Sequence, residues 1–395
     1  MIKQSSYLIR LIIVIWFVGG LSKGAISQST PSLVVGIDTT DVAIKQVYDL
    51  YTDYLNAYPD RVYINPYWNE EECLERTSQD LPCDYSALFM YRGIEDAMDF
   101  FKIYPPKIIS ILKVEDNRYA IRVLFNNSHK GYEKFNPVYI VKLYAVLNSS
   151  GDYRLENAIS YDTKNWRQFT YGDIQYIVSP NATFSKKEAK NAKIFSKKIK
   201  RLFGLKQTEQ VKYYITNNHR VMGELFNFDY WLSYSTAITN TYAGEIYTSY
   251  GDADNQHELV HILLSSLASK TNNTMLINEG VATWLAGPDK DENFRTALNR
   301  FSDEIKNNDS LTIEMITNNE YRNQLDNNPI YLVGAVICDK VYELKGTDGI
   351  KEIMQLNYED LKAYLEKLFN LPFVKVDKLI MDEIRSGKFE PFFSF

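Results

Sequence analysis

The chain has 395 residues, of which 45% are hydrophobic and 24% charged, and its formal net charge is −6 at pH 7. This length favours two globular domains over one, and the apolar content is sufficient for two real cores. The negative net charge argues against nucleic acid as a partner.

The first residues are typical of an export signal. Lys3 and Arg10 accompany an apolar run over residues 11–21, which is shorter than the roughly 20 residues that a membrane-spanning helix needs. Small residues follow over residues 24–27. We therefore expect residues 1–27 to be a cleaved signal peptide, and the protein to be periplasmic or extracellular without a stable membrane span. An uncleaved anchor is the alternative.

Residues 28–168 are predicted to form the first domain. Helical spacing occurs over residues 42–55, and a second helix is expected around residues 94–104, ending at Pro105. Strand-like runs follow over residues 108–114, 119–125, 138–147 and 153–161. Helices followed by an antiparallel meander resemble the nuclear transport factor 2-like domains, which implies an α+β cone. Such a domain would either dock a ligand or substrate, or serve as a scaffold that packs on the second domain.

The three cysteines fit an exported protein. Cys73 and Cys83 lie close together in a polar, loop-like stretch. In an oxidising compartment a disulfide between them is expected. Cys338 lies in an apolar helical run, and we expect it to be a buried free thiol.

Residues 169–395 are predicted to form the second domain. Strands are expected over residues 173–178 and 211–215. Between them, Ser185 and Glu188 form a capping box that begins a helix, and Gly204 ends it. The seven lysines and one arginine of this helix lie mostly opposite its apolar face. That pattern indicates a solvated surface rather than a binding patch.

A short motif, His257-Glu258-x-x-His261, carries the clearest chemical signal. Residues four apart share one face of a helix, so both imidazoles can bind a single metal ion. Glu258 lies one residue round the helix, where it can reach a metal-bound water without being a ligand. Nitrogen ligands beside a free carboxylate are what zinc hydrolysis requires. The alternative is an ordinary helix whose two histidines have hydrogen-bond partners.

A catalytic zinc needs a third protein ligand, and no histidine follows His261. Glu279 is the candidate, because it lies in an apolar helix expected to begin near Met275 and to end at Gly287-Pro288. A carboxylate in such surroundings is costly to bury unless it is paired or metal-bound. The alternative is a surface-facing acid on an amphipathic helix.

Together, His257-Glu258-x-x-His261 and Asn278-Glu279-Gly280-x-Ala282 resemble the gluzincin metallopeptidases, which include thermolysin and the aminopeptidase N family. The resemblance covers roughly the last half of the chain. It implies that His257, His261 and Glu279 bind Zn²⁺ and that Glu258 is the general base. It also implies a small sheet with a mostly helical C-terminal part, and a peptide or protein as substrate.

The resemblance suggests roles for two further segments. Residues 241–248 would form the edge strand along the cleft, where an extended peptide could pair with it. Beyond the metal helices, further helices are expected over residues 294–306, 328–344, 349–356 and 358–368. Tyr331 lies where the aminopeptidase-like group has a tyrosine that stabilises the oxyanion. Because the chain has 30 tyrosines, core packing is an equally good account of Tyr331.

The sequence therefore predicts an α+β protein that is an exported zinc metallopeptidase. One alternative is a ligand-binding protein with a structural or degenerate metal site. Glu258 argues against it, because a structural site has no use for a base beside its ligands. A zinc hydrolase of non-peptide amides or esters is the other alternative, which the sequence does not separate from a peptidase. Neither the cleavage specificity nor the oligomeric state follows from the sequence.

Overall fold

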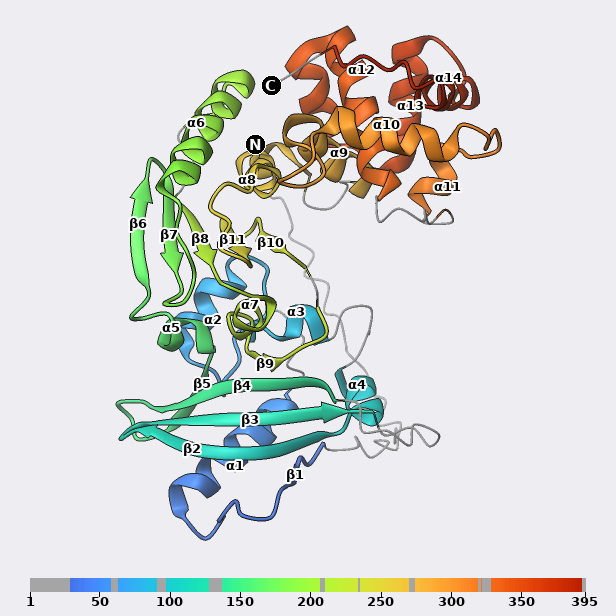
Figure 1. Ribbon diagram of the computed structural model, residues 1–395. Coiled ribbons are helices and arrows are strands. Elements are labelled where there is room, and N and C mark those ends of the chain that lie inside the picture. Colours follow the sequence, from blue (N-terminus) through green and yellow to red (C-terminus); the bar gives the residue numbers. More distant parts are fainter. Residues whose placement is uncertain are drawn as a thin grey trace, which may run out of the picture.

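The structure is a computed structural model that describes residues 29–57, 63–90, 97–127, 137–206, 210–233, 235–269, 274–318, 321 and 328–392. The expected signal peptide lies outside these residues. Within the described part of the chain, no helix combines the length and apolar character needed to span a bilayer. The protein is α+β, with two mixed sheets in the N-terminal half and a mostly helical C-terminal part (Figure 1).

The first sheet has six strands, and its antiparallel centre follows the predicted meander. Its strands are β1 (Ser32–Leu33), β2 (Pro106–Glu115), β3 (Arg118–Asn126), β4 (Pro137–Leu147), β5 (Tyr153–Glu156) and β9 (Phe228–Tyr230). The sheet is mixed, not purely antiparallel as expected, because β1 pairs parallel with β2. Strand β9 pairs with β4, so a segment from beyond residue 168 completes this sheet.

The prediction of one long strand over residues 153–161 was wrong. Strand β5 ends at Glu156, and helix α5 (Ala158–Asp162) follows. The cause is Asn157, whose buried side chain accepts a hydrogen bond from the Tyr85 amide (2.9 Å) and donates one to the Cys83 carbonyl (2.8 Å). These bonds to a distant loop turn the chain out of the sheet.

Four helices accompany the first sheet: α1 (Val42–Leu55), α2 (Glu70–Thr77), α3 (Ala87–Met90) and α4 (Ala97–Ile103). Helix α1 has the predicted bounds, and the Asp41 side chain caps it by accepting hydrogen bonds from two amides of its first turn. Helix α4 lies within the helix expected around residues 94–104, of which residues 94–96 lie outside the described part of the chain. Helices α2 and α3 were not predicted.

The second sheet has the order β10-β11-β8-β7-β6. Its strands are β6 (Arg167–Tyr171), β7 (Ile174–Val178), β8 (Val211–Ile215), β10 (Ala237–Asn240) and β11 (Glu245–Thr248). The expected edge strand over residues 241–248 was wrong. Residues 241–244 form a turn and β11 is an interior strand, because it pairs with β8 on one side and β10 on the other. The edge strand beside helix α8 (Gln256–Leu264) is β10.

Both faces of the second sheet are covered. On β8, Tyr213 belongs to the core formed with the C-terminal helices. Its neighbour Tyr214 belongs to the core formed with the first sheet. On β11, Ile246 and Tyr247 divide in the same way, as period-two alternation along a strand requires. The segments 28–168 and 169–395 therefore share one core across this face, while their division into domains stays a prediction.

The remaining helices lie beyond β7. They are α6 (Lys186–Phe203), α7 (His219–Glu224), α8 (Gln256–Leu264), a 3₁₀ turn (Ser265–Leu267), α9 (Met275–Ala286), α10 (Phe294–Ile305), α11 (Ile313–Thr317), α12 (Pro329–Ile353), α13 (Tyr358–Phe369) and α14 (Phe373–Arg385). Helix α12 consists of two helical parts that meet at Gly346, whose backbone is not helical (φ 63°, ψ −155°), and these parts correspond to the separate helices expected over residues 328–344 and 349–356. Helices α7, α11 and α14 were not predicted.

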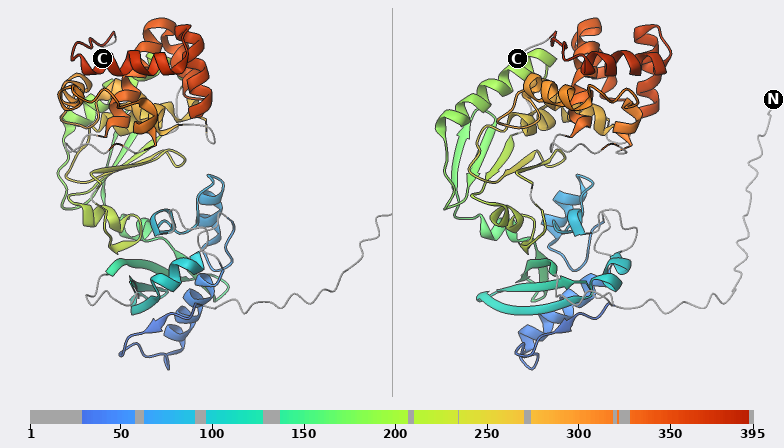
Figure 2. Two further views of the ribbon diagram at one scale, coloured as in Figure 1. Left: turned by 90° about the vertical axis from the view of Figure 1, so that its right-hand side faces the viewer. Right: turned by 45° about the vertical axis from the view of Figure 1, so that its right-hand side comes forward.

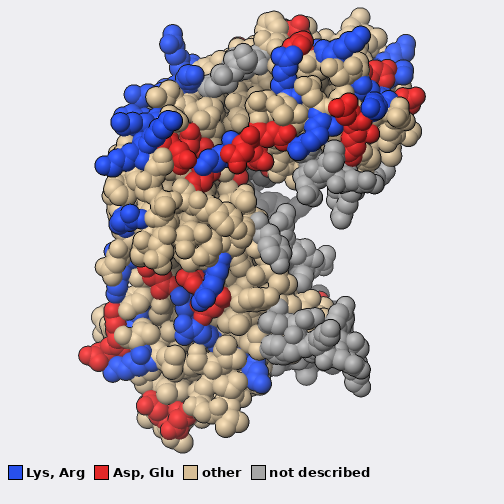
Figure 3. Space-filling view, in the orientation of Figure 1, with Lys and Arg blue, Asp and Glu red and all other residues tan. Residues whose placement is uncertain are grey.

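Helix α6 has the predicted caps. The Ser185 hydroxyl accepts from the Glu188 amide (3.2 Å), and Gly204 has φ 64°. Its apolar side packs in the core over the second sheet, and its lysines and arginine give the cationic surface at the upper left of Figure 3. This surface is solvated, as the spacing predicts.

Candidate metal centre

Helices α8 and α9 carry the predicted ligands. Helix α8 begins at its cap Asn255, whose side chain accepts from the Glu258 amide (3.2 Å). Helix α9 begins at its cap Thr274, whose hydroxyl accepts from the Leu276 amide (3.2 Å). It ends before Gly287, whose φ of 91° suits glycine. Most apolar residues of both helices are buried in one core, which fixes the two helices side by side.

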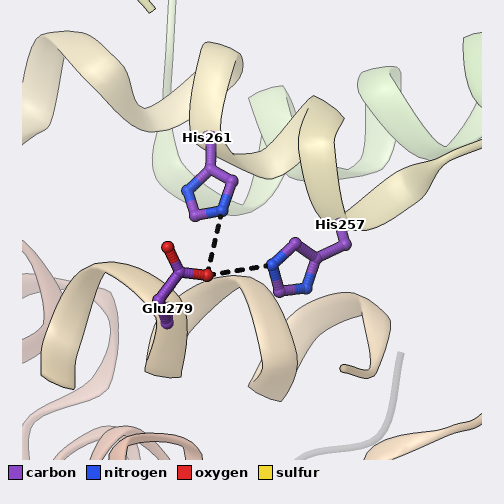
Figure 4. A group of neighbouring side chains, drawn as sticks. All are labelled: His257, His261 and Glu279. Atoms are coloured by element: carbon purple, nitrogen blue, oxygen red, sulfur yellow. Dashed lines mark hydrogen bonds and ion pairs between the residues drawn. The ribbon is translucent and has the colours of Figure 1, made fainter. Parts of the chain in front are cut away.

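The three predicted ligands converge between these helices (Figure 4). Glu279 Oε2 lies 3.2 Å from His257 Nε2 and 3.5 Å from His261 Nε2. One ligand atom from each residue lies within 4.8 Å of the others. Two imidazole nitrogens and a carboxylate oxygen are the donor set of catalytic zinc sites with three protein ligands. The group could therefore hold a metal ion.

The surroundings of His257 suit a ligand. Its side chain is buried, and its Nδ1 lies 2.8 Å from the Gly287 carbonyl oxygen. Nδ1 therefore carries the proton in the neutral ring, which leaves the Nε2 lone pair directed at the site. His261 Nδ1 is also buried, but it has no hydrogen-bond partner among the described residues. A ligand histidine usually has such a partner, so only His257 is oriented in this way.

Electrostatics keep Glu279 ionised. Burial raises its pKa, but hydrogen bonds from His257 and His261 outweigh this and hold the pKa well below its usual range. For His257, burial lowers the pKa, yet the hydrogen bond to Glu279 and the nearby negative charges leave it raised. The ionised Glu279 and the negative charge around His257 thus favour a cation at this position.

Glu258 lies beside this group without belonging to it. The Thr239 hydroxyl, on the edge strand β10, donates a hydrogen bond to Glu258 Oε2. The carboxylate is only partly buried. This position fits a proton acceptor next to a metal-bound water. Glu258 has it because it follows His257 directly in α8 and therefore points to a different side of the helix. Sequence reasoning missed Thr239, because nothing in residues 237–240 marks a partner for Glu258.

Tyr331 reaches the site through a close helix crossing. A Cβ atom added to Gly280 in α9 would lie 2.4 Å from the Gly334 backbone in α12, so only glycines permit this approach. One turn before Gly334, Tyr331 stacks on His257 with ring centroids 5.7 Å apart. Burial, and then the charge of Glu279, raise the pKa of the Tyr331 phenol, so it stays a hydrogen-bond donor. The two glycines are a second feature that sequence reasoning missed.

The cysteines lie apart from the metal group. Cys73 and Cys83 form a disulfide with Cα atoms 4.7 Å apart. Cys338 is a buried free thiol, and burial raises its pKa. It is therefore unsuited to reaction or metal binding at neutral pH.

Comparison of the chain with models of known protein families and with curated proteins finds no match. The resemblance to gluzincins stays a prediction based on two short motifs.

Proposed function

We propose that this protein is a zinc-dependent metallopeptidase of the gluzincin type. The observation that carries the proposal is the convergence of His257, His261 and Glu279 with Glu258 next to them but outside the ligand group. A structural zinc site is usually closed by four protein ligands, whereas a catalytic site keeps one position for water. Three ligands and an adjacent free carboxylate fit the catalytic class.

Each residue has a separate role in this proposal. His257, His261 and Glu279 would hold zinc, which when bound polarises a carbonyl and lowers the pKa of its water to about 7. Glu258 would accept a proton from the attacking water at its carboxylate and would donate it to the leaving amine. Tyr331, kept protonated by its surroundings, donates a hydrogen bond to the developing negative oxygen.

Export and a peptide substrate are parts of the same proposal. The disulfide between Cys73 and Cys83 supports an oxidising compartment, since disulfides are rare in the cytosol. The edge strand β10 beside Glu258 supports an extended peptide as substrate, because its free edge can pair with a backbone.

The test uses the mature protein, purified without added metal. Elemental analysis should find about one zinc per chain. A peptide library and a denatured protein should be cleaved, and cleavage should stop with a chelator and return with zinc. Absence of zinc even after reconstitution would contradict the metal centre, and bound zinc without any cleavage would contradict the peptidase.

A further inference from the structure

A cavity of about 420 Å³ adjoins the metal centre on the side of His261. His261 and Asn278, which precedes the ligand Glu279, line it from the two metal helices. Tyr242 lines it from the turn after β10. Ser78 and Gln79, which follow helix α2 in the segment of residues 28–168, line it from the opposite part of the chain. Residues far apart in sequence therefore share one cavity beside the proposed ligands.

Ser78 and Gln79 lie at the tip of a loop that is closed by the disulfide. Helix α2 begins after its cap Asn69 and ends at Thr77, and Asp80, with φ 57°, turns the chain back towards Cys83. We refer to residues 73–83 as the disulfide loop. In both views of Figure 2 this blue segment stands up from the first sheet towards the helical part. The bond between Cys73 and Cys83 joins the two ends of this loop, whose Cα atoms lie 4.7 Å apart.

A buried arginine fixes the disulfide loop from inside. Arg76 is only 3% exposed, and its Nε donates to the Pro82 carbonyl (2.8 Å). Its guanidinium lies 3.5 Å from the centroid of the Tyr85 ring. Cys73, Cys83 and Tyr85 belong to the core that includes Tyr247 of the second sheet. The base of the loop thus packs in the same core as the second sheet, to which helix α8 is connected through β11.

The chemistry of the cavity is polar and uncharged. Besides His261, the polar groups along its wall are hydroxyls and amides, and the rest of the lining is apolar. No lysine, arginine, aspartate or glutamate lines it in the described part of the chain. A charged side chain placed there would lose hydration without gaining a partner. An uncharged side chain could bind through hydrogen bonds and apolar contact.

We propose that this cavity is a substrate subsite, in which Gln79 and Ser78 of the disulfide loop select peptides with an uncharged side chain beside the scissile bond. The inference rests on the proposed peptidase function and deepens it. It gives the first-sheet segment a direct role in specificity, in addition to packing on the second sheet.

The test changes the charge at the loop tip. Gln79→Lys and Gln79→Glu are compared with the wild type on matched peptides that carry Gln, Lys or Glu at the varied position. The wild type should prefer Gln. With the Gln79→Lys variant, the ratio of kcat/KM for the Glu peptide to that for the Lys peptide should rise by about tenfold or more. With the Gln79→Glu variant, the same ratio should fall. The reason is that opposite charges attract and like charges repel at short range. Ser78→Lys provides the same test if a Gln79 variant does not fold.

Matched controls use Gln168→Lys and Gln168→Glu on the exposed strand β6, which should leave selectivity unchanged. Zinc content should stay the same in all variants, because Gln79 does not belong to the ligand group. Unchanged selectivity at position 79 in a protein that cleaves peptides would overturn the subsite and leave the peptidase intact. If neither the wild type nor the variants cleave the peptides, the affinities of the labelled Gln, Lys and Glu peptides for the Glu258→Gln protein give the same comparison between peptides. Equal affinities would then overturn the subsite independently of catalysis.

Discussion

The hydroxyl of Thr239 on the edge strand donates a hydrogen bond to the carboxylate of Glu258 on the metal helix. This bond connects the strand on which a peptide would lie with the proposed base. It orients one carboxylate oxygen, Oε2, and leaves the other available for the proton of a water. Thr239 is therefore a positioning residue for Glu258.

Thr239→Val keeps the shape of the side chain and removes the donor. We expect kcat to fall by roughly 10- to 100-fold, the equivalent of about 1.5–3 kcal/mol for a hydrogen bond to a charged group. Thr239→Ser restores the hydroxyl and should restore most of kcat, with zinc content unchanged in both. If Ser and Val reduce kcat equally, the methyl group of Thr239 matters and the hydrogen bond does not.

Glu258→Gln tests the base itself. The exchange preserves size but removes the basic carboxylate, so turnover should fall by roughly 10²–10⁴-fold. Zinc content and melting temperature should stay near wild type, because Glu258 is not among the ligands. Glu359→Gln, at an exposed glutamate of α13, serves as the control. Loss of zinc together with activity would show instead that Glu258 is needed for the site to form.

Tyr331→Phe tests the proposed oxyanion donor. The ring that stacks on His257 is retained, so zinc binding and KM should change little. Removal of a single donor should lower kcat by roughly 10²–10³-fold. Steady-state kinetics with one peptide would measure both parameters. An unchanged kcat would leave Tyr331 with a packing role only.

Zinc and protons should compete for the site. In the metal-free protein the raised pKa of His257 gives stability that is complete below about pH 6.5 and is lost as pH rises through the folded-state pKa. The lowered pKa of Glu279 gives stability that is complete above about pH 4.5 and is lost as pH falls through its folded-state pKa. The metal-free pair therefore contributes most between about pH 4.5 and 6.5.

Zinc requires neutral histidines, so the rise in melting temperature on adding zinc should be small at pH 5.5 and large at pH 8. At a free zinc concentration about 100 times Kd, the gain should be about 2.7 kcal/mol. Thermal melts with and without zinc at both pH values measure it. Glu279→Gln should reduce the gain at pH 8. An equal gain at pH 5.5 and 8 in the wild type would contradict this ligand set.

Gly334→Ala tests the helix crossing. The added Cβ would lie 1.9 Å from the Leu276 carbonyl oxygen and 2.8 Å from Gly280 Cα, so α9 and α12 must separate. Overpacking typically costs about 1–3 kcal/mol. The melting temperature should fall, and zinc affinity should fall with it because Glu279 is carried on α9. Unchanged zinc affinity in a destabilised variant would show that the position of Glu279 does not depend on this contact.

Much of the site could be predicted from the sequence because its signals are local. A spacing of four residues places His257 and His261 on one helical face whatever surrounds them. Glu279 was identified by its apolar helix, and the α-helical bounds followed from caps such as Ser185 and Gly204. Strands β2, β3 and β4 were found for the same reason, since alternation and turns are encoded within a few residues.

Only the tertiary structure decided how these parts meet. Strand order depends on pairing between distant segments, which is why β10 and not residues 241–248 forms the edge beside Glu258. Three features each join segments distant in sequence: the contact of Thr239 with Glu258, the approach of Gly280 to Gly334, and the cavity that Gln79 and His261 both line. A local pattern fixes which face of an element is buried. The packing of the whole core fixes what that face touches.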